Sequence, residues 1–372
     1  MNYSRRMFLN GAASVPALAL QALTPVAQKR AKDSNPNSTR AIGEVAARRS
    51  QPFNGIHRGE AMELPNVYHR YVEIEGVRVF YREAGPREAP TLLLLHGFPS
   101  SSAQYRRLMD ALGMRYRVIA PDYPGFGYSD APLPASAGGQ YAYSFDQLAR
   151  TIAGFCDALD LQKYFLYMFD FGGPVGMRLA LAHPERIAGL VVQNANAYYE
   201  GLSEIARTFV ALRPGVPGAV EQAQSLLTLE MTRSQYEGGA HDVARIAPDG
   251  WTLDQHFLDQ PGRKAIQVDL LLDYHNNVAQ YTEWQTWLRR HRPPTLVLWG
   301  RNDPFFIEAG AYAYLRDLPD AELHLFETGH FALEEEAPRI AVLIAAFLER
   351  HSSTMAPKTM HGDGSTPPRQ PK

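Results

Sequence analysis

The chain has 372 residues, which is enough for one large α/β domain with an insertion or for two ordinary domains. Hydrophobic residues make up 45% of it and charged residues 20%, the balance of a soluble globular protein. The formal net charge of −2 provides no overall field that would attract nucleic acid or an anionic membrane. The single cysteine, Cys156, excludes an intrachain disulfide, and no Cys/His cluster has the spacing of a zinc site. Its apolar surroundings predict a small buried side chain.

Residues 1–27 have the pattern of an export signal. Arg5 and Arg6 precede a weakly apolar, uncharged run from residue 11 to residue 27, which is similar to a twin-arginine signal. The run is too short and too rich in Ala, Gly and Pro for a membrane span. We therefore expect export to the periplasm or the exterior, with no stable membrane insertion of the mature chain. The alternative is a disordered basic N-terminus.

Two further segments are expected to lie outside the folded core. Residues 28–62 are polar and lack sustained periodicity, which predicts a linker. Residues 351–372 are rich in Ser, Thr, Pro, Gly and Lys, which predicts a disordered tail. His361 falls in this tail and is not expected to be catalytic.

Between these segments, short apolar runs alternate with amphipathic helical patterns. Residues 71–81 predict a hairpin, and buried strands are predicted at residues 91–95, 117–121, 164–169, 187–192, 295–299 and 322–326. Helices are predicted at residues 105–112, 145–159, 175–182 and 337–348. This alternation predicts an α/β fold with a mostly parallel sheet and helices on both faces.

One long interval breaks the alternation. Residues 196–292 contain helical segments and turns but no clear strand, and the interval is too long for a loop in a compact domain. We interpret it as a helical cap, inserted after the sixth strand and covering the carboxyl edge of the sheet, where open α/β sheets bind ligands. Residues 63–195 and 293–350 then form the two parts of the core.

The segment YMFDFGG, residues 167–173, ends a predicted strand and begins a predicted helix. This is the pattern of a nucleophile elbow, in which a sharp turn presents the nucleophile. Gly172 and Gly173 supply the small residues that such a turn needs, whereas Met168 stands where another small residue is usual. Asp170 occupies the position of the nucleophile, and a helix N-cap is the alternative role for this aspartate.

A second motif, His96-Gly97-Phe98-Pro99, follows the strand predicted at residues 91–95. In α/β-hydrolases this position supplies one N–H of the oxyanion hole, and the residue after the nucleophile supplies the other. The backbone amides of Phe98 and Phe171 are therefore the expected donors. We interpret His96 as a structural hydrogen-bonding residue beneath the site.

Two further candidates follow later strands. Asp303, in the segment WGRNDP, follows the strand predicted at residues 295–299, and His330 follows the strand at residues 322–326. An Asp-Pro turn is the alternative role for Asp303. The order of Asp170, Asp303 and His330 in the chain is the α/β-hydrolase order of nucleophile, acid and histidine. The three positions together predict a catalytic triad.

From about residue 71 to residue 350, the chain resembles the branch of the α/β-hydrolase superfamily that contains epoxide hydrolases and haloalkane dehalogenases. The resemblance implies that Asp170 attacks a saturated carbon and forms an alkyl ester. His330, oriented by Asp303, then activates the water that hydrolyses this ester. No cofactor or metal is implied, and the expected partners are a small apolar organic substrate and water.

The resemblance leaves the leaving group open. Opening an epoxide requires a proton donor, and Tyr274 is similar in position to the late cap tyrosine of epoxide hydrolases. The early cap tyrosine has no clear match, and the candidates for it are Tyr198, Tyr199 and Tyr236. Haloalkane dehalogenases typically have a tryptophan after the nucleophile, where this chain has Phe171. The candidates for halide binding from the cap are Trp251, Trp284 and Trp287.

Epoxide hydrolysis is the preferred interpretation, and haloalkane dehalogenation is the first alternative. A binding protein of this fold without catalytic activity is the alternative of a different class. Such proteins usually lose part of the triad, whereas all three residues are present here. The pocket is expected to be apolar because phenylalanines stand on predicted strand-end loops: Phe98, Phe126, Phe171, Phe305, Phe306 and Phe331.

Overall fold

The computed structural model describes residues 64–352. The predicted export signal (1–27), the linker (28–62) and all but the first two residues of the predicted tail lie outside these residues. Within the described part of the chain, no helix has the length and apolar character needed to cross a membrane.

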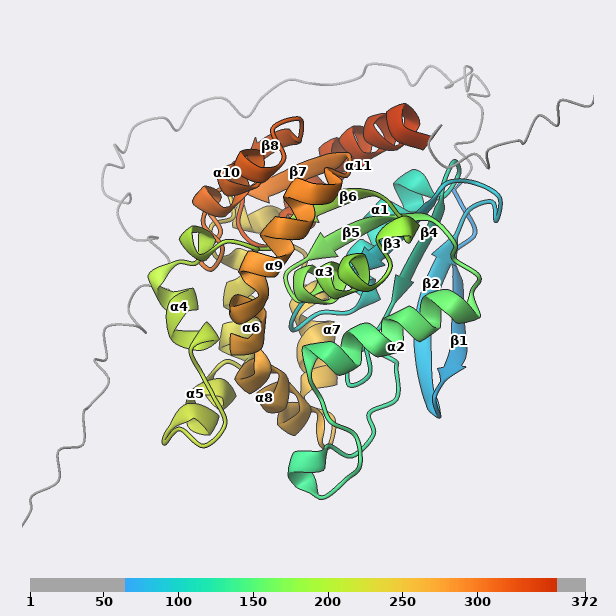
Figure 1. Ribbon diagram of the computed structural model, residues 1–372. Coiled ribbons are helices and arrows are strands. Elements are labelled where there is room, and N and C mark those ends of the chain that lie inside the picture. The colour runs from blue at the N-terminus through green and yellow to red at the C-terminus, as the bar shows by residue number, and fades with distance from the viewer. Residues whose placement is uncertain (1–63, 353–372) are drawn as a thin grey trace, which may run out of the picture. The chain divides into compact units, whose positions relative to one another are not determined.

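A single eight-stranded sheet forms the centre of the described residues, in the order β1-β2-β4-β3-β5-β6-β7-β8 (Figure 1). β2 runs antiparallel to the other seven strands, which are parallel to one another. The strands are β1 (Tyr68–Ile74), β2 (Val77–Ala84), β3 (Thr91–Leu95), β4 (Arg117–Pro121), β5 (Tyr164–Phe169), β6 (Ile187–Gln193), β7 (Thr295–Gly300) and β8 (Glu322–Phe326). The predicted mostly parallel α/β sheet is confirmed.

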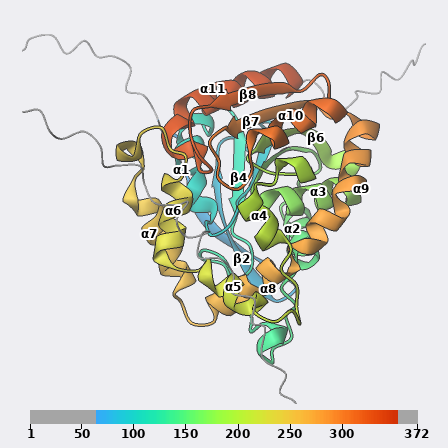
Figure 2. The same cartoon turned by 90° about the vertical axis from the view of Figure 1, so that its left-hand side faces the viewer.

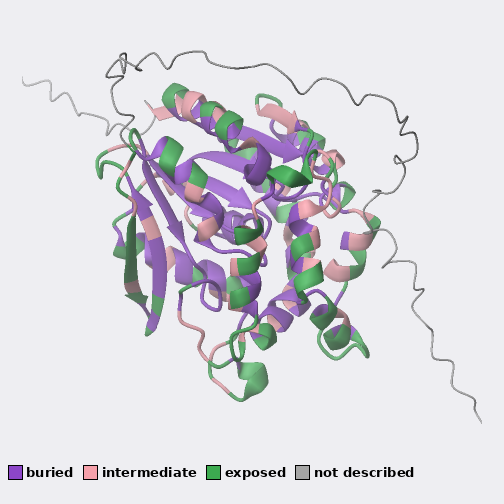
Figure 3. Ribbon diagram, turned by 180° about the vertical axis from the view of Figure 1, so that it is seen from behind, coloured by how far each residue is buried: buried purple, intermediate pink, exposed green. Residues whose placement is uncertain are grey.

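Helices cover both faces of the sheet. They are α1 (Arg106–Leu112), α2 (Phe145–Ala158), α3 (Gly172–Ala182), α10 (Glu308–Asp317) and α11 (Ala332–His351). Successive residues of a strand point to opposite faces, so Leu93 and Leu95 pack with α2 and α3, whereas Leu92 and Leu94 pack with α1 and α11. The central strands are consequently buried along their whole length (Figure 3). This double covering explains why they are continuous apolar runs in the sequence.

Cys156 lies on α2 inside one of these two cores. It is fully buried, and burial raises the pKa of its thiol to about 12. A thiol that stays protonated is a poor nucleophile. The expected role as a small buried hydrophobic residue agrees with this position.

The helical insertion joins β6 to β7, as predicted for a cap after the sixth strand. Its helices are α4 (Glu204–Val210), α5 (Ala219–Ser225), α6 (Leu229–Glu237), α7 (Pro248–Leu258), α8 (Arg263–Asp273) and α9 (His275–His291). Figure 2 shows α6 and α7 on the left, α9 on the right, and α5 and α8 between them at the bottom. This region contains no strand longer than an isolated bridge, as the sequence pattern predicted.

The last helix differs from its prediction. The sequence pattern placed its start at residue 337, but α11 begins at Ala332, close behind His330. Its first turn looks exposed in the sequence because it contains acidic residues, yet Glu334 and Glu335 are buried with partners. Glu334 pairs with Arg106, and Glu335 accepts hydrogen bonds from the backbone of the cap segment after α6. The early start of α11 therefore holds the loop of His330 against both the core and the cap.

Candidate active site

The loop between β5 and α3 is a sharp strand-to-helix turn. Asp170 has φ of 48°, in the left-handed region that non-glycine residues seldom adopt. Helix α3 starts two residues later, and a Cβ at Gly172 would lie 2.2 Å from the carbonyl oxygen of Leu95, so only glycine fits there. This geometry is the strained turn expected of a nucleophile elbow.

Met168 departs from the usual elbow pattern, and a neighbouring glycine accommodates it. A Cβ at Gly176 of α3 would lie 2.6 Å from the sulfur of Met168, which is too close for any side chain. The long thioether thus occupies space that the absent side chain of Gly176 leaves open. Helix α3 can therefore pack closely on β5 although the small residue is missing from the strand.

The carboxylate of Asp170 is held by backbone amides. Its Oδ1 atom accepts a hydrogen bond of 2.6 Å from the N–H of Phe98, and the N–H of Phe171 also interacts with the carboxylate. The side chain makes no capping hydrogen bond to α3, whose N-cap residue is Phe171. The alternative role of Asp170 as a helix N-cap is therefore wrong. The two expected oxyanion donors, Phe98 and Phe171, both face this carboxylate.

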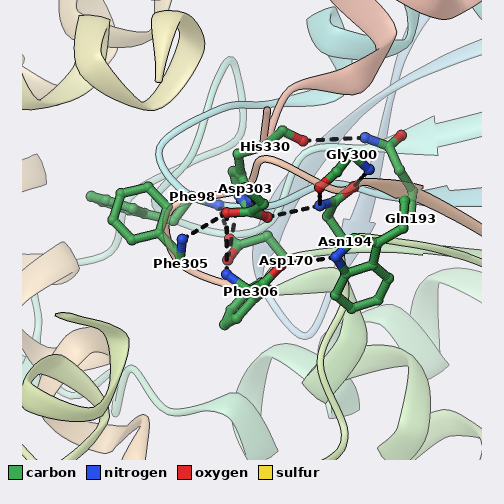
Figure 4. A network of polar contacts seen from close by, with 10 residues as sticks. Phe98, Asp170, Gln193, Asn194, Gly300, Asp303, Phe305, Phe306 and His330 are labelled. Carbon is green, nitrogen blue, oxygen red and sulfur yellow. Dashed lines mark hydrogen bonds and ion pairs between the residues drawn. The ribbon is translucent and has the colours of Figure 1, made fainter. Parts of the chain in front are cut away.

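Asp303 follows β7 and His330 follows β8, the two strands beyond β6 in the sheet, and both side chains lie beside Asp170 (Figure 4). The Nδ1 atom of His330 is 2.6 Å from Oδ2 of Asp303, and its Nε2 atom is 3.9 Å from Oδ2 of Asp170. All three side chains are buried. The structure thus brings together the three residues predicted from three separate strand ends, in the sequence acid–imidazole–carboxylate.

The carboxylate of Asp303 is saturated with hydrogen bonds. Its Oδ1 atom accepts from the backbone N–H groups of Phe305 and Phe306, at 2.8 and 3.1 Å. Its Oδ2 atom accepts a hydrogen bond of 2.8 Å from Nδ2 of Asn194, in addition to the contact with His330. The Asp-Pro turn and the triad role are thus compatible, because each uses a different oxygen. A carboxylate fixed on both oxygens holds the imidazole in one orientation.

Asn194 also belongs to the site, although the sequence pattern did not predict it. This residue follows β6, has φ of 42°, and links two strand ends: its Nδ2 atom donates to Asp303 and its Oδ1 atom accepts from the backbone N–H of Gly300. The available signal was the polar segment Gln193-Asn194 directly after a buried strand, the same signal that identified the other site residues.

Burial and charge shift the pKa values of the reactive pair. Burial raises the pKa of the Asp170 carboxyl above its ordinary value, against the opposing effects of His330 and the amides of Phe98 and Phe171. Burial on its own would lower the pKa of His330, but the charge and hydrogen bond of Asp303, aided by Asp170, outweigh it and raise this pKa above 6.5. The imidazole is therefore a stronger base than a free histidine.

His96 behaves as expected for a structural residue. It is fully buried, its Nδ1 atom is 2.9 Å from the carbonyl oxygen of Gly97, and its Nε2 atom accepts a hydrogen bond from the N–H of Tyr123. Burial lowers the pKa of His96 to about 3, so the ring stays neutral at physiological pH. It supports the loop that carries Phe98 and does not reach the cavity.

A cavity opens above Asp170 and His330. Its walls are mostly apolar, and the residues from the cap include Ala206, Phe209, Val210, Leu226, Met231, Gln235, Leu271 and Tyr274. The expected phenylalanines that line it are Phe98, Phe171, Phe305 and Phe306. The expectation for Phe126 and Phe331 is wrong, since both pack beside the site without lining the cavity.

Tyr274 lies at the junction of α8 and α9 and lines the cavity. Its ring packs on the rings of Phe145 and Phe171, with centroids 5.5 and 5.8 Å away. Burial raises the pKa of its hydroxyl well above 10. Tyr274 thus stands next to the residue that follows Asp170, with its proton retained at neutral pH.

The other aromatic candidates from the cap do not reach the cavity. The hydroxyl of Tyr198 donates to Asp317, that of Tyr236 donates to Asp254, and Tyr199 is exposed. The predicted candidates for an early cap tyrosine are therefore wrong. The candidates for halide binding are wrong for the same reason. Each of these tryptophans packs against other residues and does not line the cavity: Trp251, Trp284 and Trp287.

Residues 64–352 contain no group of three or more His, Cys, Asp or Glu side chains arranged to hold a metal ion. The polar groups that meet at the cavity floor are the Asp170 carboxylate, the His330 imidazole and two backbone N–H groups. This set can supply a nucleophile, a base and an oxyanion hole.

Comparison with known proteins agrees with this geometry. Residues 90–337 match the family model described as alpha/beta hydrolase fold. An uncharacterised hydrolase of Saccharomyces cerevisiae is 39% identical over 295 residues, which cover 76% of this chain and 97% of that protein. Epoxide hydrolase 2 of Caenorhabditis elegans is 24% identical over 300 residues, covering 78% and 82%. The crystal structure of haloalkane dehalogenase DbeA from Bradyrhizobium elkani has a TM-score of 0.65 at 20% identity, covering 78% of this chain and 100% of that one.

Proposed function

The chain belongs to the alpha/beta hydrolase family, and we propose that it is an epoxide hydrolase that acts on small apolar epoxides through a covalent ester of Asp170. The observation that carries the proposal is an aspartate, and not a serine, at the elbow between two oxyanion donors and a histidine. A carboxylate displaces a leaving group at saturated carbon and becomes an alkyl ester.

In the first step, Asp170 attacks a ring carbon of the epoxide. The N–H of Phe98 holds Oδ1, so Oδ2 is the oxygen that attacks. The carbon–oxygen bond of the ring breaks, its electron pair moves to the epoxide oxygen, and Tyr274 donates a proton to that oxygen. The raised pKa of Asp170 reflects its removal from water, and a poorly solvated carboxylate is the more reactive nucleophile.

In the second step, water hydrolyses the ester. His330 removes a proton from the water as it adds to the carboxyl carbon of Asp170, and the negative charge that forms there faces the N–H groups of Phe98 and Phe171. Collapse of this intermediate releases the second diol oxygen and restores the carboxyl group. The two protons from water return to the diol oxygen and to Tyr274.

The alternative leaving group, a halide, has little support at this site. Halide ions require N–H donors from side chains beside the nucleophile, and Phe98 and Phe171 offer none. The tryptophans of the cap do not line the cavity. The other alternative, a binding protein of this fold without catalytic activity, is disfavoured because Asp170, Asp303 and His330 are all present and in contact.

Replacing Tyr274 with phenylalanine tests the proton donor. Tyr274→Phe is expected to lower the rate of diol formation by about 10²-fold, the lower end of the effect of a general acid. It should lower the thermal unfolding temperature only slightly, because the ring contacts with Phe145 and Phe171 remain and only the hydrogen bond between the hydroxyls of Tyr274 and Tyr281 is lost. Diol and halide release are measured side by side on matched epoxides and haloalkanes. Halide release without diol formation by the wild-type protein would overturn the proposal.

The pH dependence follows from the two shifted groups. His330 acts as a base only when neutral, and Asp303 raises its pKa above 6.5 in the free protein. Turnover is therefore expected to fall as the pH is lowered through the pKa of His330. The hydroxyl of Tyr274 has a pKa well above 10, so no loss of activity is expected up to pH 9 to 10. A pH–rate profile with a decline between pH 7 and 9 would contradict these assignments.

A further inference from the structure

Gln235 is a polar side chain in the cavity wall that the proposed mechanism does not use. It lies on α6 and is 6% exposed. It lines the cavity together with Met231, one helical turn earlier on the same helix face. The other side chains of the cavity wall with a polar group are Asp170, Tyr274 and His330.

The carboxamide of Gln235 forms no hydrogen bond with any other residue between 64 and 352. Its buried neighbours on α6 are different: Thr232 donates to Gln255, and Tyr236 donates to Asp254. The amide nitrogen and oxygen of Gln235 are not among the fully enclosed, unpartnered side-chain atoms of the described residues, so they reach the surface of the cavity. A polar group that faces a substrate cavity and has no partner in the fold is available to a ligand.

Gln235 and Tyr274 belong to different walls of the cavity. The end of α6 packs on the loop of His330, since a Cβ at Gly329 would lie 1.9 Å from the carbonyl oxygen of Gly238. The ring of Tyr236 also stacks on that of Phe331, with centroids 3.9 Å apart. Tyr274 instead packs on Phe171, the residue after Asp170. The two cap side chains therefore enter the same cavity as Asp170 from different helices, Gln235 beside the loop of His330 and Tyr274 beside Phe171.

We propose that Gln235 is a catalytic residue that donates an N–H hydrogen bond to the leaving oxygen of the substrate, opposite Tyr274. This inference rests on the proposed function. An epoxide oxygen has two lone pairs and can accept from both donors at once. An amide does not release its proton, so Tyr274 gives the proton while Gln235 stabilises the charge that develops before the transfer is complete. The negative charge grows in the transition state, where such a donor has its greatest effect.

The test separates formation of the ester from its hydrolysis. In a His330→Ala background, where the ester accumulates, Gln235→Met should slow formation of the Asp170 adduct by about 10²-fold. Ser234→Ala is the control on α6, because Ser234 does not line the cavity and its hydroxyl donates to the carbonyl oxygen of Met231; it should change the rate by less than about 3-fold. Rapid quenching with intact His330 measures how fast the ester disappears, and Gln235→Met should leave this rate unchanged.

Stability provides a second readout. Gln235→Met and the alternative Gln235→Leu each replace an unpartnered amide with an apolar group, so neither should lower the thermal unfolding temperature. Slower adduct formation in a protein of unchanged stability assigns Gln235 to the alkylation step.

Two results would overturn the inference. The first is formation of the adduct by Gln235→Met at the unchanged rate. The second is a slowing confined to ester hydrolysis, which would mean that Gln235 binds the attacking water and not the leaving oxygen. If the proposed function itself is wrong, the result is different: His330→Ala, with Gln235 intact, would form no adduct from an epoxide that the wild-type protein converts.

Discussion

Asp170→Asn is expected to abolish diol formation, with a loss of about 10⁴-fold or more, the scale of nucleophile removal in covalent hydrolases. Asparagine is the informative replacement because it tolerates the positive φ of this position, whereas alanine would add backbone strain. The amide retains the shape of the side chain and one oxygen for the N–H of Phe98, but it is not a nucleophile. Steady-state turnover of an epoxide measures the effect.

The same substitution should not lower the stability of the fold. Burial raises the pKa of Asp170 in the folded state, so the ionised carboxyl destabilises the fold at pH values above that pKa. A neutral amide removes this effect, and the advantage of Asp170→Asn should grow as the pH rises from the unfolded-state pKa through the folded-state pKa. Thermal unfolding at several pH values checks this sign. A variant that is inactive because it is unfolded would not support the nucleophile assignment.

The residues of the core site were predictable because of the topology. Asp170, Asp303 and His330 each follow a buried apolar run, and parallel strands place their carboxyl ends at one edge of the sheet. The sequence pattern therefore specified which side chains would meet, although about 160 residues separate the first from the last. Asn194 obeys the same rule and was available to the same reasoning.

The cap was not predictable in the same way. Amphipathic periodicity identifies a helix but does not reveal whether its apolar face meets the core or a substrate cavity. Trp284 and Trp287 illustrate the first case, since they are buried in the core, whereas Met231 and Gln235 illustrate the second. Tyr236 was a candidate for the early cap tyrosine, but the residue that faces the cavity is its neighbour Gln235. A shift of one residue on a helix rotates a side chain by about 100°, and only the tertiary packing determines that rotation.

His330→Ala is the second substitution with a large expected effect. Alkylation requires Asp170 and a positioned substrate, whereas hydrolysis requires water activated by the imidazole, because neutral water is a poor nucleophile toward an unactivated ester. Steady-state turnover should therefore fall by about 10²- to 10⁴-fold, and the ester should accumulate. His330 is buried next to Asp303, so thermal unfolding must accompany the kinetics to show that the variant remains folded.

The central claim is a covalent bond between substrate and Asp170, and mass spectrometry of the His330→Ala variant tests it most directly. After incubation with an epoxide that the wild-type protein converts, the peptide containing Asp170 is expected to gain the full mass of that epoxide. The Asp170→Asn, His330→Ala double variant should gain none. An unmodified Asp170 peptide in the folded single variant would contradict the covalent mechanism and would favour direct attack of water on the epoxide.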